Sequence, residues 1–190
     1  MRISILGPPG SGKSTQARRV SEICKLTHIY PGELLRQEAE KDSPFALRIK
    51  EYLGAGLLVP SDIVLCLVER ELARSFGRFV LDGFPRTIIQ ALELEFLLEQ
   101  RKEKLDAVII LEVSLDEILR RLLARGRSDD VPELIEQRVR VFHEETDPVI
   151  EFYRQKEVLL PVNGIGPPEV VTQRIFDALQ VEPASCSLDA

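Results

Sequence analysis

A glycine-rich segment follows the first apolar run of the chain and restricts what the chain can fold into. Gly7 to Thr15 comes directly after Ile3–Leu6 and fits the phosphate-binding pattern G-x-x-x-x-G-K-S/T. Glycines let the backbone curl until its N–H groups converge on a polyphosphate. The pattern therefore predicts a nucleoside triphosphate site between a strand and a helix, in preference to an ordinary turn.

The same segment supplies side chains for that site. Lys13 can reach the β- and γ-phosphates, and the Ser14 hydroxyl is placed to ligate Mg²⁺. The helix that follows, over 13–24, points its positive end at the same anion. The residues expected at the donor phosphates are Gly10, Ser11, Gly12, Lys13, Ser14 and Thr15.

Composition excludes several classes of partner. With 190 residues, 44% of them apolar, the chain is long enough for one domain with a substantial core. Its net charge of −6 gives no general electrostatic reason to bind nucleic acid or an anionic membrane. The scattered cysteines Cys24, Cys66 and Cys186 predict reduced thiols in a cytoplasmic protein, with Cys24 and Cys66 in the core. We expect a monomer.

Short β-rich runs alternate with helical periodicity along the chain. This alternation favours a parallel sheet with helices on both faces, and such sheets bind ligands beyond the carboxyl ends of their strands. Strands are predicted at 2–6, 27–30, 79–81, 107–113 and 158–162. Helices are predicted at 13–24, 61–74, 87–100, 115–124, 133–141, 148–156 and 168–179.

A carboxylate ends the apolar run at 79–81. In a chain with a phosphate loop, Asp82 at this place is the expected partner for Mg²⁺. Ser14 and Asp82 are therefore the predicted metal site, with Asp82 acting through a water ligand. A helix N-cap is the alternative role for Asp82, but Thr87 already serves that purpose. Arg86 lies beside Asp82 and is expected to contact phosphate.

Arginines are concentrated late in this acidic chain. Arg121 and Arg125 are four residues apart, so they share one flank of a helix. The planar guanidinium suits the charge that phosphoryl transfer spreads over several oxygens. Arg120 and Arg140 are expected to be ordinary solvated charges. The other members of the cluster are Arg127 and Arg138, with Asp129 and Asp130 expected to hold the arginines in place.

Together these segments resemble the adenylate kinases, within the nucleoside monophosphate kinases. The matching blocks are 7–15, 31–36, 56–60, 82–90, 121–138, 147–153 and 162–164. The resemblance implies an α/β, three-layer P-loop nucleoside triphosphate hydrolase-like fold with a five-stranded parallel sheet and helices on both faces. It implies one domain over 1–183, with a monophosphate-binding insertion at 30–60, a very short lid at 121–138 and a flexible tail at 184–190.

The resemblance also implies a reaction, in which the γ-phosphoryl of Mg-ATP passes reversibly to AMP to give two ADP. The catalytic residues it implies are Lys13, Arg86, Arg121, Arg125, Arg127 and Arg138. The donor ATP would also meet Arg121, Arg125, Gly164, Ile165 and Gly166. The acceptor AMP would lie against Pro31, Gly32, Arg36, Leu57, Leu58, Val59, Gly83, Arg86, Gln90, Arg127 and Arg138. Among these, Gln90 would offer the amide that reads adenine.

The chain departs from the family pattern at three places. Pro31 stands where the family usually has Thr or Ser, so a hydroxyl and an N–H are missing from the acceptor site. Glu33 replaces the usual Asp. In the lid, only Gly126 separates Arg125 from Arg127, and a segment this short covers the donor less well.

Two alternative functions stay open at this point. One is a kinase for UMP or CMP, which the loss of polar groups at Pro31 favours. The other is a slow P-loop ATPase with an assembly or regulatory role, which the short lid favours. Arg36, Arg86 and Gln90 argue against this second alternative, because such a protein has no need for a complete acceptor site.

Overall fold

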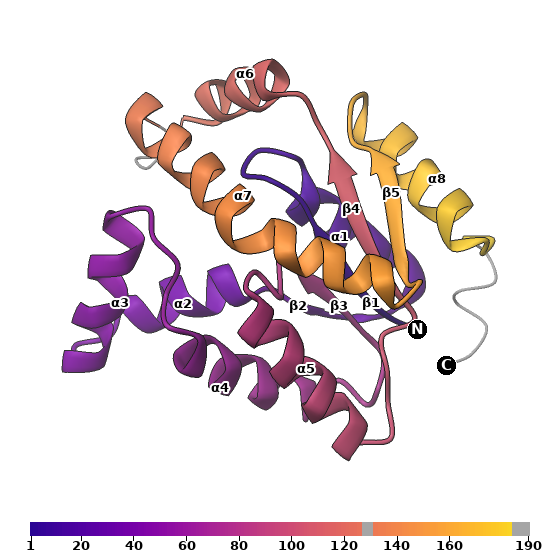
Figure 1. Cartoon of the computed structure of the whole chain (residues 1–190), viewed down its shortest axis with the longest axis horizontal. Helices are drawn as coiled ribbons and strands as arrows, with labels where there is room; N and C mark the ends of the chain where they lie inside the picture. Colours follow the sequence, from indigo (N-terminus) through magenta and orange to yellow (C-terminus); the bar gives the residue numbers. More distant parts are fainter. Residues whose placement is uncertain (127–130, 184–190) are drawn as a thin grey trace.

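Five parallel strands form one sheet in the order β2-β3-β1-β4-β5 (Figure 1). The computed structural model describes residues 1–126 and 131–183. The strands are β1 (Arg2–Leu6), β2 (Thr27–Ile29), β3 (Phe79–Asp82), β4 (Ala107–Glu112) and β5 (Leu159–Asn163). The predicted strands are confirmed, and each end lies within one residue of its prediction.

Helices fill the connections between the strands. They are α1 (Lys13–Cys24), α2 (Pro31–Ala39), α3 (Pro44–Gly54), α4 (Ser61–Leu72), α5 (Ile88–Gln100), α6 (Leu115–Arg125), α7 (Pro132–Gln155) and α8 (Pro168–Leu179). Thr87 is the N-cap of α5, as predicted, and its hydroxyl accepts a hydrogen bond from the backbone N–H of Gln90 at 3.2 Å. No helices were predicted where α2 and α3 lie, and these two helices occupy much of the predicted insertion at 30–60.

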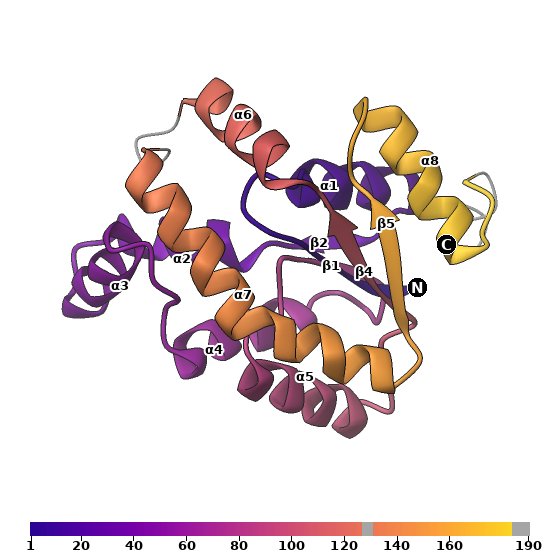
Figure 2. The same cartoon turned by 45° about the horizontal axis from the view of Figure 1, so that its top comes forward.

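Strand residues alternate between two apolar layers, one on each face of the sheet. Phe79 and Leu81 of β3 pack in the layer that holds α4, α5 and α7, whereas Val80 packs in the layer with α1 and α8. Figure 2 shows α1 and α8 on one side of the sheet and α5 and α7 on the other. The three-layer α/β fold is therefore confirmed. Because both faces are covered, the central strands read as continuous apolar runs.

Strand register brings two distant turns together. Ile5 of β1 pairs with Asp82 of β3, and the backbone N–H of Gly83 donates to the carbonyl of Ile5 at 2.9 Å. The carboxyl ends of the two strands consequently lie side by side. The glycine-rich loop after β1 and the turn after β3 thus share one edge of the sheet.

Helix α7 is one continuous helix with a proline in its interior. The prediction of separate helices at 133–141 and 148–156 is wrong, because one helix continues through Pro148. Pro148 is exposed, so water can solvate the carbonyl that its missing N–H leaves without a partner. Val149 and Tyr153 on one side of it and Phe142 on the other pack against the same core. This shared packing keeps the two halves aligned.

The prediction for Cys66 is also wrong, because its side chain is exposed. The buried positions of α4 are Ile63, Val64, Leu67, Val68 and Leu72. Cys66 lies on the opposite side of the helix from these residues. Cys24 is buried against the α1 and α8 layer, as predicted.

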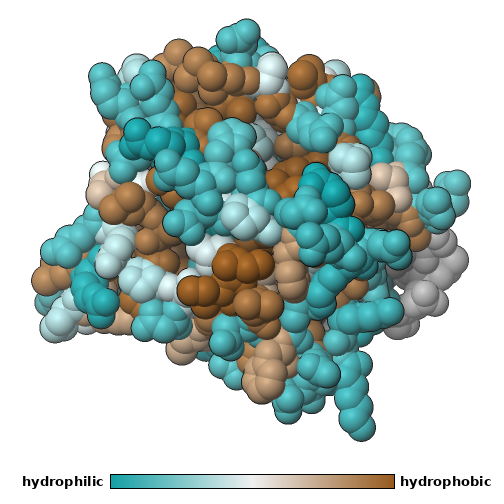
Figure 3. Space-filling view, in the orientation of Figure 1, coloured by the Kyte–Doolittle hydropathy of each residue, from teal (hydrophilic) through white to brown (hydrophobic). Residues whose placement is uncertain are grey.

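Helix α5 is apolar on both sides. Ala91, Leu94 and Leu98 are buried, whereas Leu92 and Phe96 are more than half exposed. Figure 3 shows exposed apolar side chains over the lower centre of this face, where α5 lies in Figure 1.

No helix in residues 1–126 or 131–183 is long and apolar enough to span a bilayer. The predicted tail at 184–190 and the predicted roles of Arg127, Asp129 and Asp130 lie outside the described residues.

Pro148→Ala should stabilise the protein. Proline in a helix interior costs about 3 kcal/mol of stability relative to alanine. The same proline restricts the unfolded chain, which stabilises the folded protein by about 0.4–1 kcal/mol and offsets part of that cost. Because both halves of α7 are already aligned, we expect the free energy of unfolding to rise by about 1–2 kcal/mol. Urea denaturation measures it, with Glu144→Ala as the matched exposed control. A loss of stability would show that the core packing of α7 depends on the proline.

Candidate functional site

A cavity of about 450 Å³ opens at the carboxyl ends of β1 and β3. Its walls come from the glycine-rich loop, the start of α2, the α3–α4 connection, the β3–α5 turn, the end of α6 and the middle of α7. Most predicted site residues line it: Gly10, Gly12, Lys13, Ser14, Thr15, Pro31, Gly32, Arg36, Leu57, Leu58, Val59, Gly83, Arg86, Gln90, Arg121, Arg125 and Arg138. Ser11, Asp82, Gly164, Ile165 and Gly166 do not line it, and Arg127 lies outside the described residues.

The geometry of the glycine-rich loop explains its glycines, of which Gly10 and Gly12 are examples. Gly10 has a φ of 78°, and a Cβ there would lie 2.8 Å from the side chain of Leu122. Gly12 is the N-cap of α1 with a φ of 93°. Residues that carry a Cβ rarely adopt a backbone conformation with such a positive φ. The loop therefore packs closely against α6 and leads directly into the N-terminus of α1, which favours a bound anion.

Lys13 folds back over this loop. Its Nζ donates to the carbonyl of Pro8 at 3.1 Å. Burial lowers the pKa of Lys13 to about 7, and the nearby positive charge of Arg86 adds to this effect. Lys13 therefore sits where a positive charge is costly without an anion beside it.

The turn after β3 is fixed from both sides. The Ser4 hydroxyl donates to the carbonyl of Phe84 at 2.6 Å, and the Thr146 hydroxyl of α7 donates to the carbonyl of Arg86 at 2.9 Å. The Nε of Arg86 donates to the carbonyl of Gly83 at 2.8 Å. Sequence reasoning missed Ser4 and Thr146, because each acts through backbone groups more than 50 residues away.

Lys13 and Arg86 approach each other across Gly83. A Cβ on Gly83, which has a φ of 65°, would lie 3.0 Å from Cε of Lys13 and 3.2 Å from Nη2 of Arg86. Burial also lowers the pKa of Arg86 from its usual value. Two basic groups are thus held close together in a partly buried place, an arrangement that a bound polyanion would relieve.

Asp82 is fully buried beside these cations. One carboxylate oxygen, Oδ2, lies 3.4 Å from Nε2 of His28. The other, Oδ1, has no hydrogen-bond partner among the residues that the structure describes. A buried carboxylate oxygen without a partner is costly. Together with the Ser14 hydroxyl at the wall of the cavity, this oxygen fits a hydrated divalent cation, for which hard oxygen donors are the preferred ligands.

Gln90 is held in one orientation. Its Oε1 accepts from the backbone N–H of Arg86 at 2.8 Å, and its Nε2 approaches the hydroxyl of Ser61 at 3.4 Å. Because a backbone N–H can only donate, the amide oxygen must face Arg86. The NH₂ group therefore lies on the side of Ser61. Gln90 itself lines the cavity.

Tyr30 is a cavity residue that sequence reasoning missed. Its ring is stacked on His28, and the guanidinium of Arg36 lies 5.1 Å from the ring centroid. Arg36 also donates to Glu33 at 2.8 Å. Burial raises the pKa of the Tyr30 phenol, but Arg36 outweighs it, so the pKa falls below its usual value. An aromatic residue directly after a strand could have been noticed, but its ring is also typical of core packing.

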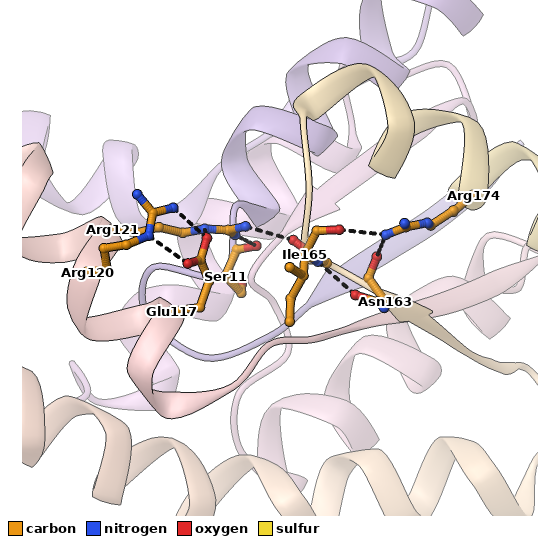
Figure 4. Close-up of polar contacts among 8 residues, drawn as sticks. Ser11, Glu117, Arg120, Arg121, Asn163, Ile165 and Arg174 are labelled. Atoms are coloured by element: carbon orange, nitrogen blue, oxygen red, sulfur yellow. Dashed lines mark hydrogen bonds and ion pairs between the residues drawn. The ribbon is translucent and has the colours of Figure 1, made fainter.

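Arg121 lines the cavity beside the glycine-rich loop. It donates to the carboxylate of Glu117, to the carbonyl of Ser11 and to the carbonyl of Gly164 (Figure 4). Arg125 and Arg138 line the same cavity. Arg120 and Arg140 lie at the surface, as predicted, and each pairs with an acidic neighbour.

Comparisons with known proteins identify the family. The model of the adenylate kinase family matches residues 5–158. A protein of Nocardioides sp. named adenylate kinase is 40% identical, covering 97% of this chain and 100% of its own length. A protein of Mycolicibacterium smegmatis with the same name is 43% identical, covering 94% of this chain and 99% of its own length. Another of this name, from Prochlorococcus marinus, is 40% identical and covers 97% of this chain and 98% of its own length. The resemblance found in the sequence is thereby confirmed, and the chain belongs to the adenylate kinase family.

Proposed function

We propose that this chain is an adenylate kinase, a phosphotransferase that passes the γ-phosphoryl of Mg-ATP reversibly to AMP and gives two ADP. One observation carries the proposal. Lys13 of the glycine-rich loop and Arg86 of the β3–α5 turn meet across Gly83 at the wall of one cavity. A donor phosphate at the loop and an acceptor phosphate at the turn would meet at this point.

Donor binding is assigned to the glycine-rich loop and α6. The backbone N–H groups of residues 10–15 would surround the phosphates, and Lys13 would follow the phosphoryl group as it moves. Arg121 and Arg125 would offer further positive charge. The loop at 164–166, which Arg121 contacts through Gly164, would lie near the donor base.

Acceptor binding is assigned to the opposite wall. Arg36 and Arg86 would bind the AMP phosphate, and Arg138 would add charge as the phosphoryl group passes between the nucleotides. The base would lie against residues 57–59. The oriented NH₂ of Gln90 would donate to a ring nitrogen of adenine. The backbone of Pro31 and Gly32 would complete the acceptor pocket.

The chemistry requires little covalent work from the protein. The AMP phosphate is itself a nucleophile, so no general base is needed, and His28 is left to its contact with Asp82. Positioning the two phosphates in line and neutralising their charge are the main contributions. A magnesium ion held by Ser14 and, through water, by Asp82 would neutralise charge on the donor phosphates.

The alternatives from the sequence fit less well. The relatives carry the name adenylate kinase, not that of a UMP or CMP kinase. A regulatory ATPase would not need Arg36, Arg86 and Gln90 gathered on a second wall of the cavity. A monomeric enzyme in the cytoplasm remains our expectation for this chain.

Lys13→Met should abolish turnover and leave the fold intact. Methionine keeps the length of the side chain but removes the charge that follows the phosphoryl group, so we expect kcat to fall about 1000-fold or more. ADP formation from ATP and AMP measures it, with thermal unfolding to check the fold. The control is Lys41→Met, an exposed lysine paired with Glu38. Near-normal ADP formation by Lys13→Met would refute the role.

Arg86→Ala should impair use of the acceptor. A charge-assisted hydrogen bond to phosphate contributes about 1.5–3 kcal/mol, so kcat/KM for AMP should fall about 10- to 100-fold. The affinity for ATP, measured by calorimetry without AMP, should change less than about twofold. Arg70→Ala on the outside of α4 is the matched control. Unchanged acceptor kinetics would remove Arg86 from the acceptor site.

Nucleotide binding should take up a proton in mildly alkaline solution. The lowered pKa of Lys13, about 7, leaves this amine mostly neutral above that pH. A bound polyphosphate favours the charged form and raises the pKa, so ATP binding at about pH 8.5 should take up close to one proton. Calorimetry in buffers of different ionisation enthalpy measures the uptake. The Lys13→Arg variant, whose guanidinium stays charged, should show no such proton uptake. Equal uptake by the native protein and by this variant would mean that another group takes up the proton.

A further inference from the structure

Two arginines hold the loop that follows β5. Arg174 of α8 donates to the carbonyls of Asn163 and Ile165 at 2.9 and 2.7 Å. Arg121 of α6 donates to the intervening carbonyl, that of Gly164, at 3.0 Å. Figure 4 shows the two guanidinium groups reaching this loop from opposite sides. Three successive carbonyls are therefore bound, which fixes the backbone of this loop.

Arg121 also binds the glycine-rich loop. Its Nη1 donates to the carbonyl of Ser11 at 3.1 Å. Ser11 follows β1 and Gly164 follows β5, the two strands that pair with β4 on its two sides. One guanidinium thus joins α6 to the phosphate loop and to the loop after β5.

Glu117 fixes the orientation of Arg121. Its Oε1 accepts from Nε of Arg121 at 2.7 Å, one helical turn away on α6. Both side chains are about one-fifth exposed, at 19% and 21%. Hydrogen bonds from Arg120 and Arg121 lower the pKa of Glu117 to about 2, so the carboxylate is charged at any working pH.

The donor count of Arg121 leaves room for a ligand. A guanidinium has five N–H donors in a fixed fork. Among the described residues Arg121 makes three bonds, one to Glu117 and one to each loop. Within residues 1–126 and 131–183, a second N–H on each terminal nitrogen remains for the nucleotide. Arg121 can therefore connect the two loops and contact a donor at the same time.

We propose that Glu117 is a positioning residue for donor binding, holding Arg121 as a bridge that joins the phosphate loop to the loop at 163–166 before the nucleotide arrives. The proposal rests on the proposed function only in taking ATP as the donor. Preorganised side chains lose less conformational freedom on binding. This arrangement would suit a chain with a very short predicted lid, since the donor loops are connected by α6 itself.

The test is the affinity for ATP in the absence of an acceptor, measured by calorimetry. Glu117→Ala should weaken ATP binding about three- to tenfold, and Glu117→Gln, which keeps an acceptor oxygen, should weaken it less. The affinity for AMP should change less than about twofold. In a chain that already carries Arg121→Ala, the further change Glu117→Ala should have less than about a twofold effect.

Arg120→Ala is the matched control. Arg120 binds the same carboxylate at 2.7 Å but is 68% exposed and reaches neither loop. It should leave the ATP affinity within about twofold of the native value. If Glu117 had only a structural role, Glu117→Ala would lower the unfolding temperature and weaken the binding of ATP and of AMP alike.

Two results would overturn the proposal: native ATP affinity in Glu117→Ala, or an equal loss from Glu117→Ala with and without Arg121. Failure of the proposed function has a different signature. The native chain would then bind ATP and form no ADP from ATP and AMP, while the order of ATP affinities among the variants persisted.

Discussion

The pairing of β1 with β3 is the constraint on which the rest of the site depends. Register sets Ile5 opposite Asp82, so the glycine-rich loop and the β3–α5 turn leave the sheet side by side. Only this arrangement brings Lys13 to Arg86 across a residue without a Cβ. The turn is then held by Ser4 from the sheet and Thr146 from α7. Backbone pairing thus positions charges that would otherwise repel each other.

Electrostatics links this geometry to the proposed chemistry. Cationic side chains converge on a buried edge of the sheet, in a chain that is acidic overall. Burial and mutual repulsion lower the pKa of Lys13 and of Arg86. The fold bears this cost because packing of two extensive apolar layers offsets it. Bound phosphates would neutralise these charges and so remove the cost of burying them. The same charges would therefore contribute both to nucleotide affinity and to catalysis.

The sequence predicted the strands well, because a parallel sheet buried on both faces leaves continuous apolar runs. It also predicted most residues of the cavity, since a glycine-rich pattern and the family blocks fix their spacing. It failed at Pro148, where tertiary packing overrides a local helix breaker, and at Cys66, where an apolar sequence context hid an exposed position. Ser4, Thr146 and Glu117 were missed because their contacts depend on three-dimensional proximity or rotamer, which no local pattern records.

The most direct test of the account is ADP formation by the purified protein with Mg-ATP and AMP, UMP, CMP or GMP in parallel. The oriented amide of Gln90 and the charges around Lys13 and Arg86 predict rapid turnover with AMP and at most slow turnover with the other acceptors. Preferred use of UMP or CMP would contradict the proposed base recognition. Slow loss of ATP that is indifferent to every acceptor would contradict phosphoryl transfer between nucleotides altogether.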